Sequence, residues 1–85
     1  MWSEAADLEL LMDRLAAAGV AMLLRVDVER FDAGRPHWTV LLSGPALYPD
    51  NTIRVDAHGL GTGITRGLQR LREHDGDWEW LDDWV

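Results

Sequence analysis

The chain has 85 residues, a net charge of −7 and no cysteine, and 47% of its residues are hydrophobic. A chain of this length forms one domain, residues 1–85, with one small core and no disulfide or thiolate chemistry. Its negative charge disfavours binding to phosphate backbones or anionic lipids and favours a basic partner. No apolar run approaches the roughly 20 residues of a membrane helix, so we expect a cytoplasmic protein.

The first predicted element is an amphipathic helix that begins at Ser3 and ends at Gly19. Ser3 is a favourable N-cap residue, because its hydroxyl can accept a hydrogen bond from a free amide of the first turn. Glycine at position 19 suits the left-handed turn that ends many helices. Helical spacing places the buried face at Leu8, Leu11, Met12 and Leu15.

Three strands are predicted next, because apolar residues alternate with other residues at a period of two. They cover residues 20–29, 37–43 and 53–58, and loops at residues 31–36 and 44–51 join them. Short connections of this kind produce an antiparallel meander. The inward-facing side chains are expected to be Met22, Leu24, Val26, Val28, Trp38, Val40, Leu42, Ile53, Val55 and Ala57.

A second helix is expected to begin at Gly61 or Thr62 and to end near Gly76. Its apolar face consists of Ile64, Leu68 and Leu71. Gly67 lies within this face, where a glycine costs roughly 1 kcal/mol relative to alanine. We therefore expect that Gly67 allows the helix to approach the sheet closely.

Residues 75–85 hold three of the five tryptophans and five acidic residues. This segment fits either a strand or a short helix, and we favour the helix because paired aspartates are rare in strands. The predicted fold class is therefore α+β. Its order is α-β-β-β-α, with both helices on one face of a three-stranded antiparallel meander and a short aromatic segment at the C-terminus.

The outer face of this sheet is left to solvent or to a partner. Leu23 and Leu41 are apolar positions on that face, so one prediction is a homodimer that forms through it.

Two histidines on the outer sheet face, His37 and His58, have Asp27 and Asp56 as expected neighbours. Their spacing matches no metal-binding or nucleophile motif. The glycine-rich residues 59–63 precede a helix, as phosphate-binding loops do, but they lack the Gly-Lys-Ser/Thr ending. We therefore expect no enzyme activity, no cofactor and no metal.

The element order, the Gly34-Arg-Pro-His37 turn and the glycine-rich entry to an arginine-bearing helix are similar to the layout of double-stranded-RNA-binding domains. That resemblance implies binding to a nucleic-acid duplex by shape and phosphate contacts. The chain has no lysine, whereas that family uses a lysine cluster on its second helix. The contacts implied here are His37, Arg66, Arg70 and Arg72.

The C-terminal segment favours a different function, in which its side chains divide between the core and a partner. Trp78 and Leu81 are expected to close the core. The side chains expected to bind a partner are Asp77, Glu79, Trp80, Asp82, Asp83 and Trp84. We expect a small acidic inhibitor, encoded by a bacterium or phage, that acts by steric and electrostatic occlusion. Immunity proteins, antitoxins and blockers of host nucleic-acid enzymes are proteins of this kind.

Overall fold

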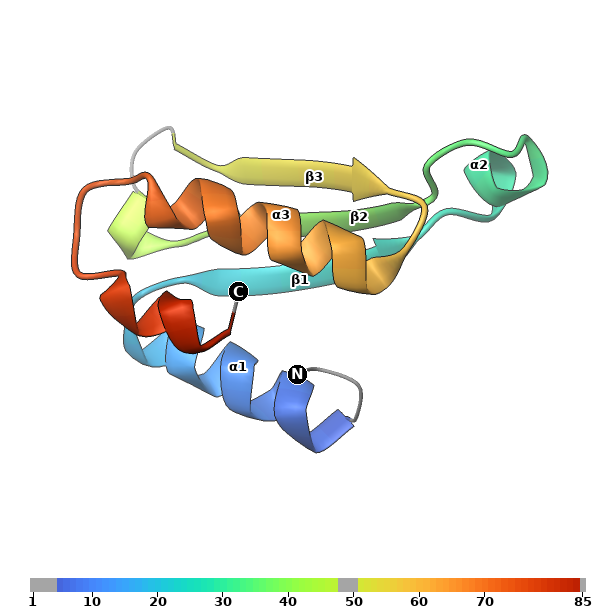
Figure 1. Cartoon of the computed structure of the whole chain (residues 1–85). Coiled ribbons are helices and arrows are strands. Elements are labelled where there is room, and N and C mark those ends of the chain that lie inside the picture. Colours follow the sequence, from blue (N-terminus) through green and yellow to red (C-terminus); the bar gives the residue numbers. More distant parts are fainter. Residues whose placement is uncertain (1–4, 48–50, 85) are drawn as a thin grey trace.

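The computed structural model of the chain describes residues 5–47 and 51–84, so the predicted N-cap Ser3 lies outside the described residues. The elements in chain order are α1 (Ala5–Ala17), β1 (Ala21–Val26), α2 (Val28–Asp32), β2 (Trp38–Ser43), η1 (Pro45–Leu47), β3 (Ile53–Ala57), α3 (Leu60–Arg72) and η2 (Glu79–Asp83) (Figure 1). The elements η1 and η2 are 3₁₀ helices. None of the helices within the described ranges is long and apolar enough to cross a membrane.

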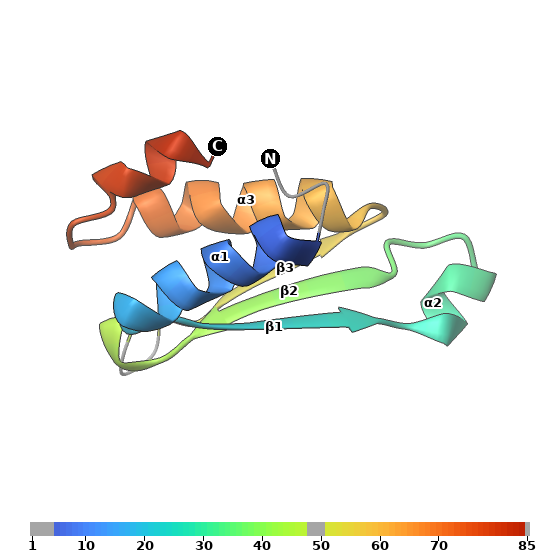
Figure 2. The same ribbon diagram turned by 90° about the horizontal axis from the view of Figure 1, so that it is seen from below.

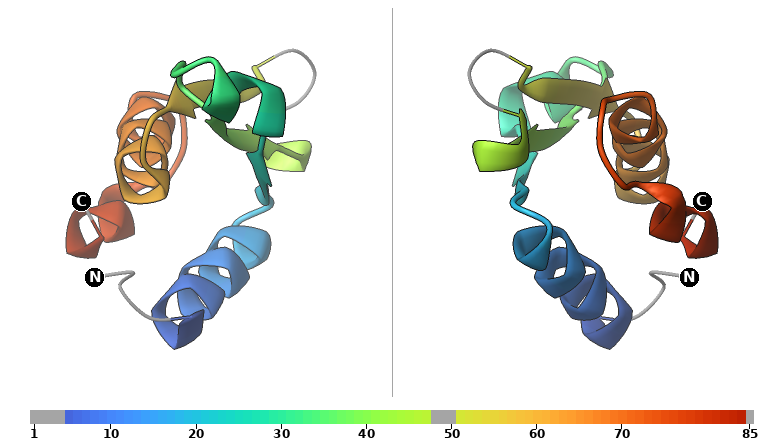
Figure 3. Two further views of the ribbon diagram at one scale, coloured as in Figure 1. Left: turned by 90° about the vertical axis from the view of Figure 1, so that its right-hand side faces the viewer. Right: turned by 90° about the vertical axis from the view of Figure 1, so that its left-hand side faces the viewer.

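The three strands form an antiparallel sheet in the order β1-β2-β3. Seen from below and end-on to the strands, α1, α3 and η2 all lie on one side of this sheet (Figures 2 and 3). Among residues 5–47 and 51–84, no helix lies along the strands on the other face, while α2 extends beyond the ends of β1 and β2. The predicted α+β fold with a three-stranded meander is confirmed.

The register of the sheet explains which side chains form the core. Val40 on β2 lies opposite Leu24 on β1 and Val55 on β3, so these three side chains share the face that the helices cover. Leu47 is also buried, although it lies in a predicted loop. The largest fully buried side chains are Leu11, Leu15, Val20, Val40, Leu42, Ile64, Leu68, Leu71 and Leu81.

The predicted first strand is wrong beyond Val26, and the predicted loop that follows it is wrong in part. Residues Val28–Asp32 form the short helix α2 instead. Asp27 is the N-cap, and its Oδ1 accepts a hydrogen bond from the backbone N–H of Arg30 at 3.0 Å. Val28 fits the strand pattern by position alone, but the Asp27 cap turns the chain before that position is reached.

The second predicted helix is found as α3, which begins at Leu60, one residue earlier than expected, and ends at Arg72. Gly67 is buried against β2 and β3, so the close approach expected there is found. Gly63, one turn earlier, approaches the sheet more closely still. A Cβ atom at Gly63 would lie 3.0 Å from Cγ2 of Val40, whereas one at Gly67 would lie 3.5 Å from Cγ1 of the same valine.

These two glycines are expected to respond differently to alanine. Gly67→Ala should raise the free energy of unfolding by up to about 1 kcal/mol, because the methyl group fits and alanine favours the helix. Gly63→Ala should lower it by about 1–2 kcal/mol, because fully buried Val40 has no room to move away. Urea denaturation of both variants measures the difference. Equal stabilisation by the two substitutions would contradict this packing.

Candidate partner-binding surface

A tight turn after α3 places the C-terminal segment against the core. Gly76 has a φ of 136°, and a Cβ atom there would lie 2.8 Å from Nε1 of Trp78. Trp78 folds back over this glycine, and its indole N–H donates a hydrogen bond to the Asp75 carbonyl oxygen at 3.2 Å. Only glycine suits both this backbone conformation and this close approach.

The segment after the turn divides its side chains between the core and the surface. Trp78 and Leu81 are buried at 4% and 0% exposure, as expected from their spacing. Trp80 and Trp84 are half-buried and pack against the edge of the core. The favoured short helix is found as the five-residue 3₁₀ helix η2.

An ion pair holds η2 to the end of α3. The Arg72 guanidinium donates to both carboxylate oxygens of Asp82, with distances of 3.1 Å from Nε to Oδ1 and 3.4 Å from Nη2 to Oδ2. The hydrogen bond to Asp82 and the nearby charges of Asp82, Glu79 and Asp77 raise the pKa of Arg72. Two residues predicted to contact different partners, Arg72 and Asp82, therefore bind each other.

Helix α1 supplies the other half of this surface. The guanidinium carbon of Arg14 lies 4.4 Å from the ring centroid of Trp80, at cation–π distance. Leu10, which is 61% exposed, and Ala17 lie beside Trp80 and Trp84 along one open groove. These α1 residues were not predicted, because they lie beside the buried stripe of Leu8, Leu11 and Leu15 and not within it.

Carboxylates surround these aromatic side chains. Asp13, Asp77, Glu79 and Asp83 are exposed, and their carboxylates form no hydrogen bond or ion pair with any other residue that the structure describes. We use the term tail surface for η2, its preceding turn and the adjacent face of α1. It comprises Leu10, Asp13, Arg14, Ala17, Asp77, Glu79, Trp80, Asp82, Asp83 and Trp84.

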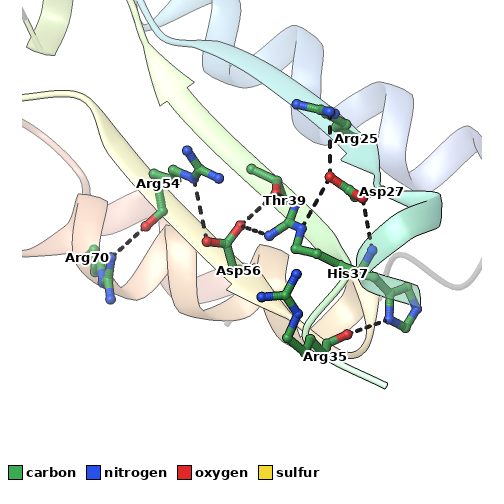
Figure 4. Close-up of polar contacts among 9 residues, drawn as sticks. Arg25, Asp27, Arg35, His37, Thr39, Arg54, Asp56 and Arg70 are labelled. Atoms are coloured by element: carbon green, nitrogen blue, oxygen red, sulfur yellow. Dashed lines mark hydrogen bonds and ion pairs between the residues drawn. The ribbon is translucent and has the colours of Figure 1, made fainter. Parts of the chain in front are cut away.

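A separate polar network fixes α2 to the outer face of the sheet (Figure 4). Arg30 donates to the Thr39 hydroxyl at 2.8 Å and pairs with Asp56 at 3.0 Å and with Asp27 at 3.4 Å. The Thr39 hydroxyl donates in turn to Asp56 at 2.6 Å. Arg25 and Arg54 complete the network through ion pairs of 3.6 Å to Asp27 and 3.5 Å to Asp56.

This network should make the free energy of unfolding depend on pH. The Thr39 hydroxyl and Arg30 lower the pKa of Asp56, and the Arg30 amide and guanidinium lower the pKa of Asp27. Their contribution should be complete above the unfolded-state pKa of about 4 and should be lost as pH falls through the lower native pKa. Urea denaturation between pH 7 and pH 2 should show a smaller loss for Arg30→Met than for the wild type. Identical pH profiles would contradict this assignment.

The two outer-face histidines lie near each other, and His37 also lies beside Asp27, whose backbone N–H donates to the His37 carbonyl oxygen at 2.8 Å. The ring centroids of His37 and His58 are 6.2 Å apart, and the His37 ring lies edge-on to Phe31 at 4.9 Å. The carboxylates of Asp27 and Asp56 pair with arginines and not with the histidine rings. Among the described residues, no group of three histidine, aspartate or glutamate side chains could hold a metal ion.

The residues implied by the nucleic-acid resemblance are spread over the molecule. His37 lies near the start of α3, while Arg70 and Arg72 lie at its other end. Arg70 donates to the Arg54 carbonyl oxygen at 2.8 Å, and Arg72 pairs with Asp82. Arg66 is exposed on the middle of α3. The fold therefore does not gather these four side chains into one compact basic patch.

Comparisons with protein-family models, with curated proteins and with solved structures find no match to this chain. A function for the chain must therefore be inferred from the chemistry of its own surfaces.

Proposed function

We propose that the chain is a small protein-interaction module that binds a basic protein through the tail surface. The observation that carries this proposal is the juxtaposition of half-buried Trp80 and Trp84 with the exposed acids Asp77, Glu79 and Asp83. Tryptophan is enriched at interface hot spots, and carboxylates around it select a positively charged partner. An inhibitor of a basic nuclease, such as an immunity protein or an antitoxin, needs a binding surface of this kind.

The proposed mechanism is occlusion of the partner's functional surface. The negative charge of the chain raises the rate of association with a basic protein, and burial of the indoles slows dissociation. A phage-encoded blocker of a host nucleic-acid enzyme would work in the same way, because its carboxylates occupy the place of phosphates. The proposal assigns the chain no catalytic role and places it in the cytoplasm, where proteins without disulfides are common.

The structure favours this mechanism because the tail surface is pre-organised. Buried Trp78 and Leu81, the Arg72–Asp82 ion pair and the Arg14–Trp80 contact all fix η2 before any partner binds. A binding surface that is already ordered loses less conformational entropy on association.

The charge part of this proposal is tested by association kinetics with a basic protein that the wild-type chain captures from bacterial lysate. Asp77→Asn/Glu79→Gln should lower the association rate by about five- to tenfold at low salt and leave the dissociation rate nearly unchanged. High salt should remove the difference. Glu29→Gln/Asp32→Asn on α2 is the matched control, with the same change in charge. A control that slows association equally would refute the assignment to the tail surface.

Nucleic-acid binding is the alternative proposal. One observation favours it: the His37 and His58 rings lie 6.2 Å apart, so the first hairpin and the entry to α3 meet at one end of the molecule. Filter binding with duplex RNA and duplex DNA tests this alternative. Binding at moderate salt with a steep salt dependence would support it, and no binding at low salt would remove it.

A homodimer through the outer sheet face is a further proposal about partners. Leu23 on β1 lies opposite Leu41 on β2, and Leu23 is 61% exposed. Sedimentation equilibrium tests it. A mass that rises with concentration, and that Leu23→Glu returns to the monomer value, would support the dimer. A mass that stays at the monomer value at every concentration would contradict it.

A further inference from the structure

The open groove between α1 and η2 combines an apolar lining with acidic groups. Its volume is about 400 Å³. Leu10, Ala17 and the two indoles supply apolar surface, while two carboxylates from different elements line the same space. The lining residues are Leu10, Asp13, Arg14, Ala17, Trp80, Asp83 and Trp84.

A contact within the chain shows one kind of group that packs on this surface. Arg14 extends from α1 and places its guanidinium 4.4 Å from the Trp80 ring centroid. Arg14 and Trp80 line both the groove and a second hollow, which Asp75 and Asp77 also line. One guanidinium therefore already lies on an indole of the tail surface.

We propose that the groove binds an arginine side chain of the partner protein. The methylene stem lies along Leu10 and the indole of Trp84, and the guanidinium lies between the carboxylates of Asp13 and Asp83. This inference rests on the proposed function, since it names the residue type through which a basic partner engages the tail surface.

Charge and shape together select arginine. An aliphatic or aromatic side chain would fill the apolar part but would leave Asp13 and Asp83 without a counter-ion. Lysine would satisfy the charge, but its compact ammonium is strongly hydrated. The planar guanidinium is more weakly hydrated, stacks on indole rings and pairs with carboxylates through several donors. Phosphate groups are excluded by the same two carboxylates.

The test titrates the full-length, ¹⁵N-labelled chain with three capped peptides, acetyl-Gly-Arg-Gly-amide and its lysine and citrulline counterparts. Assigned indole N–H signals report binding at Trp80 and Trp84. We expect saturable shifts with the arginine peptide, and binding of the citrulline peptide, which has the same shape without the charge, about tenfold weaker. Equal shifts with arginine and citrulline would overturn the proposal.

Matched variants locate the binding site. Asp13→Asn/Asp83→Asn should weaken binding of the arginine peptide about tenfold. Glu29→Gln/Asp32→Asn makes the same change in charge on α2 and should leave this binding unchanged. Equal weakening by both pairs would show a general charge effect and overturn the assignment. A second copy of the chain could also supply an arginine. If indole shifts appear when the protein alone is concentrated, and the substitutions Arg25→Gln/Arg54→Gln remove them, the occupant of the groove is a second copy, and the proposal of a partner arginine is overturned.

The peptide result is distinguishable from failure of the proposed function. If no peptide binds while Trp80→Ala/Trp84→Ala still abolishes binding of the partner protein, the arginine assignment is wrong and the tail surface remains the interface. If the arginine peptide binds but the partner protein binds the Trp80→Ala/Trp84→Ala variant as tightly as the wild type, the groove lies outside the interface. The proposed function is then wrong.

Discussion

Trp78→Ala is expected to lower the free energy of unfolding by about 3–5 kcal/mol. The indole is 4% exposed and packs in the same core cluster as Leu71 and Leu81. Its loss leaves a cavity and removes the anchor that holds η2 against the body. Small domains have total stabilities of about 5–15 kcal/mol, so much of this variant should be unfolded near 37 °C. Urea denaturation followed by far-ultraviolet circular dichroism measures the change.

Trp80→Ala is the matched control for this substitution. The same atoms are removed, but this side chain is only half-buried, so the loss of stability should be clearly smaller. Equal losses for the two variants would contradict the division of the tail between core and surface.

The double substitution Trp80→Ala/Trp84→Ala is expected to weaken binding of the partner protein by at least about 100-fold. A hot-spot tryptophan contributes about 2 kcal/mol or more, and 1.4 kcal/mol corresponds to a tenfold change in affinity. The two effects need not add, which is why the expected loss is a lower bound. Biolayer interferometry should show most of the change in the dissociation rate.

Val28→Ala/Phe31→Ala is the control for this prediction. These two side chains are also large, apolar and exposed, but they lie on α2, at the other end of the sheet (Figure 1). The control should bind the partner like the wild type. A loss that is equal in both variants, or absent from both, would contradict the assignment of the interface to η2.

The strands were predictable because their faces differ strongly in polarity. Ile53, Val55 and Ala57 alternate with Arg54 and Asp56, and a slip of one residue would bury the charged set. Helix α2 was missed because it is a short helix that replaces the end of a predicted strand and the start of a predicted loop. Its only clear signal is Asp27, because aspartate is a favourable N-cap residue.

The tail surface was only partly predictable for a related reason. Helical spacing along the chain placed Trp78 and Leu81 together in the core, and the structure agrees. The contacts of Trp80 with α1 depend on how two distant segments pack, which no local pattern encodes. Arg14 is one of several charged residues on α1, and nothing in the sequence marks it as the one that meets an indole.

The polar network on the outer sheet face shows a similar limit. Thr39 alternates with the inward-facing residues Trp38 and Val40 and points to the outer face, as this alternation predicts, yet it is buried. Arg30 covers it, because this arginine extends from α2 to the sheet and its guanidinium donates to the Thr39 hydroxyl at 2.8 Å. The burial of Thr39, on a strand that was predicted, therefore depends on α2, a helix that was not predicted.

Mapping the residues that the partner protein protects from exchange tests most directly whether the tail surface is the binding site. Hydrogen–deuterium exchange of the wild-type chain, alone and bound to its captured partner protein, should show new protection at residues 10–17 and 77–84. Residues 28–37, around α2, should exchange at unchanged rates. Protection confined to α2, to the outer sheet face or to α3 would contradict the assignment of the tail surface as the binding site.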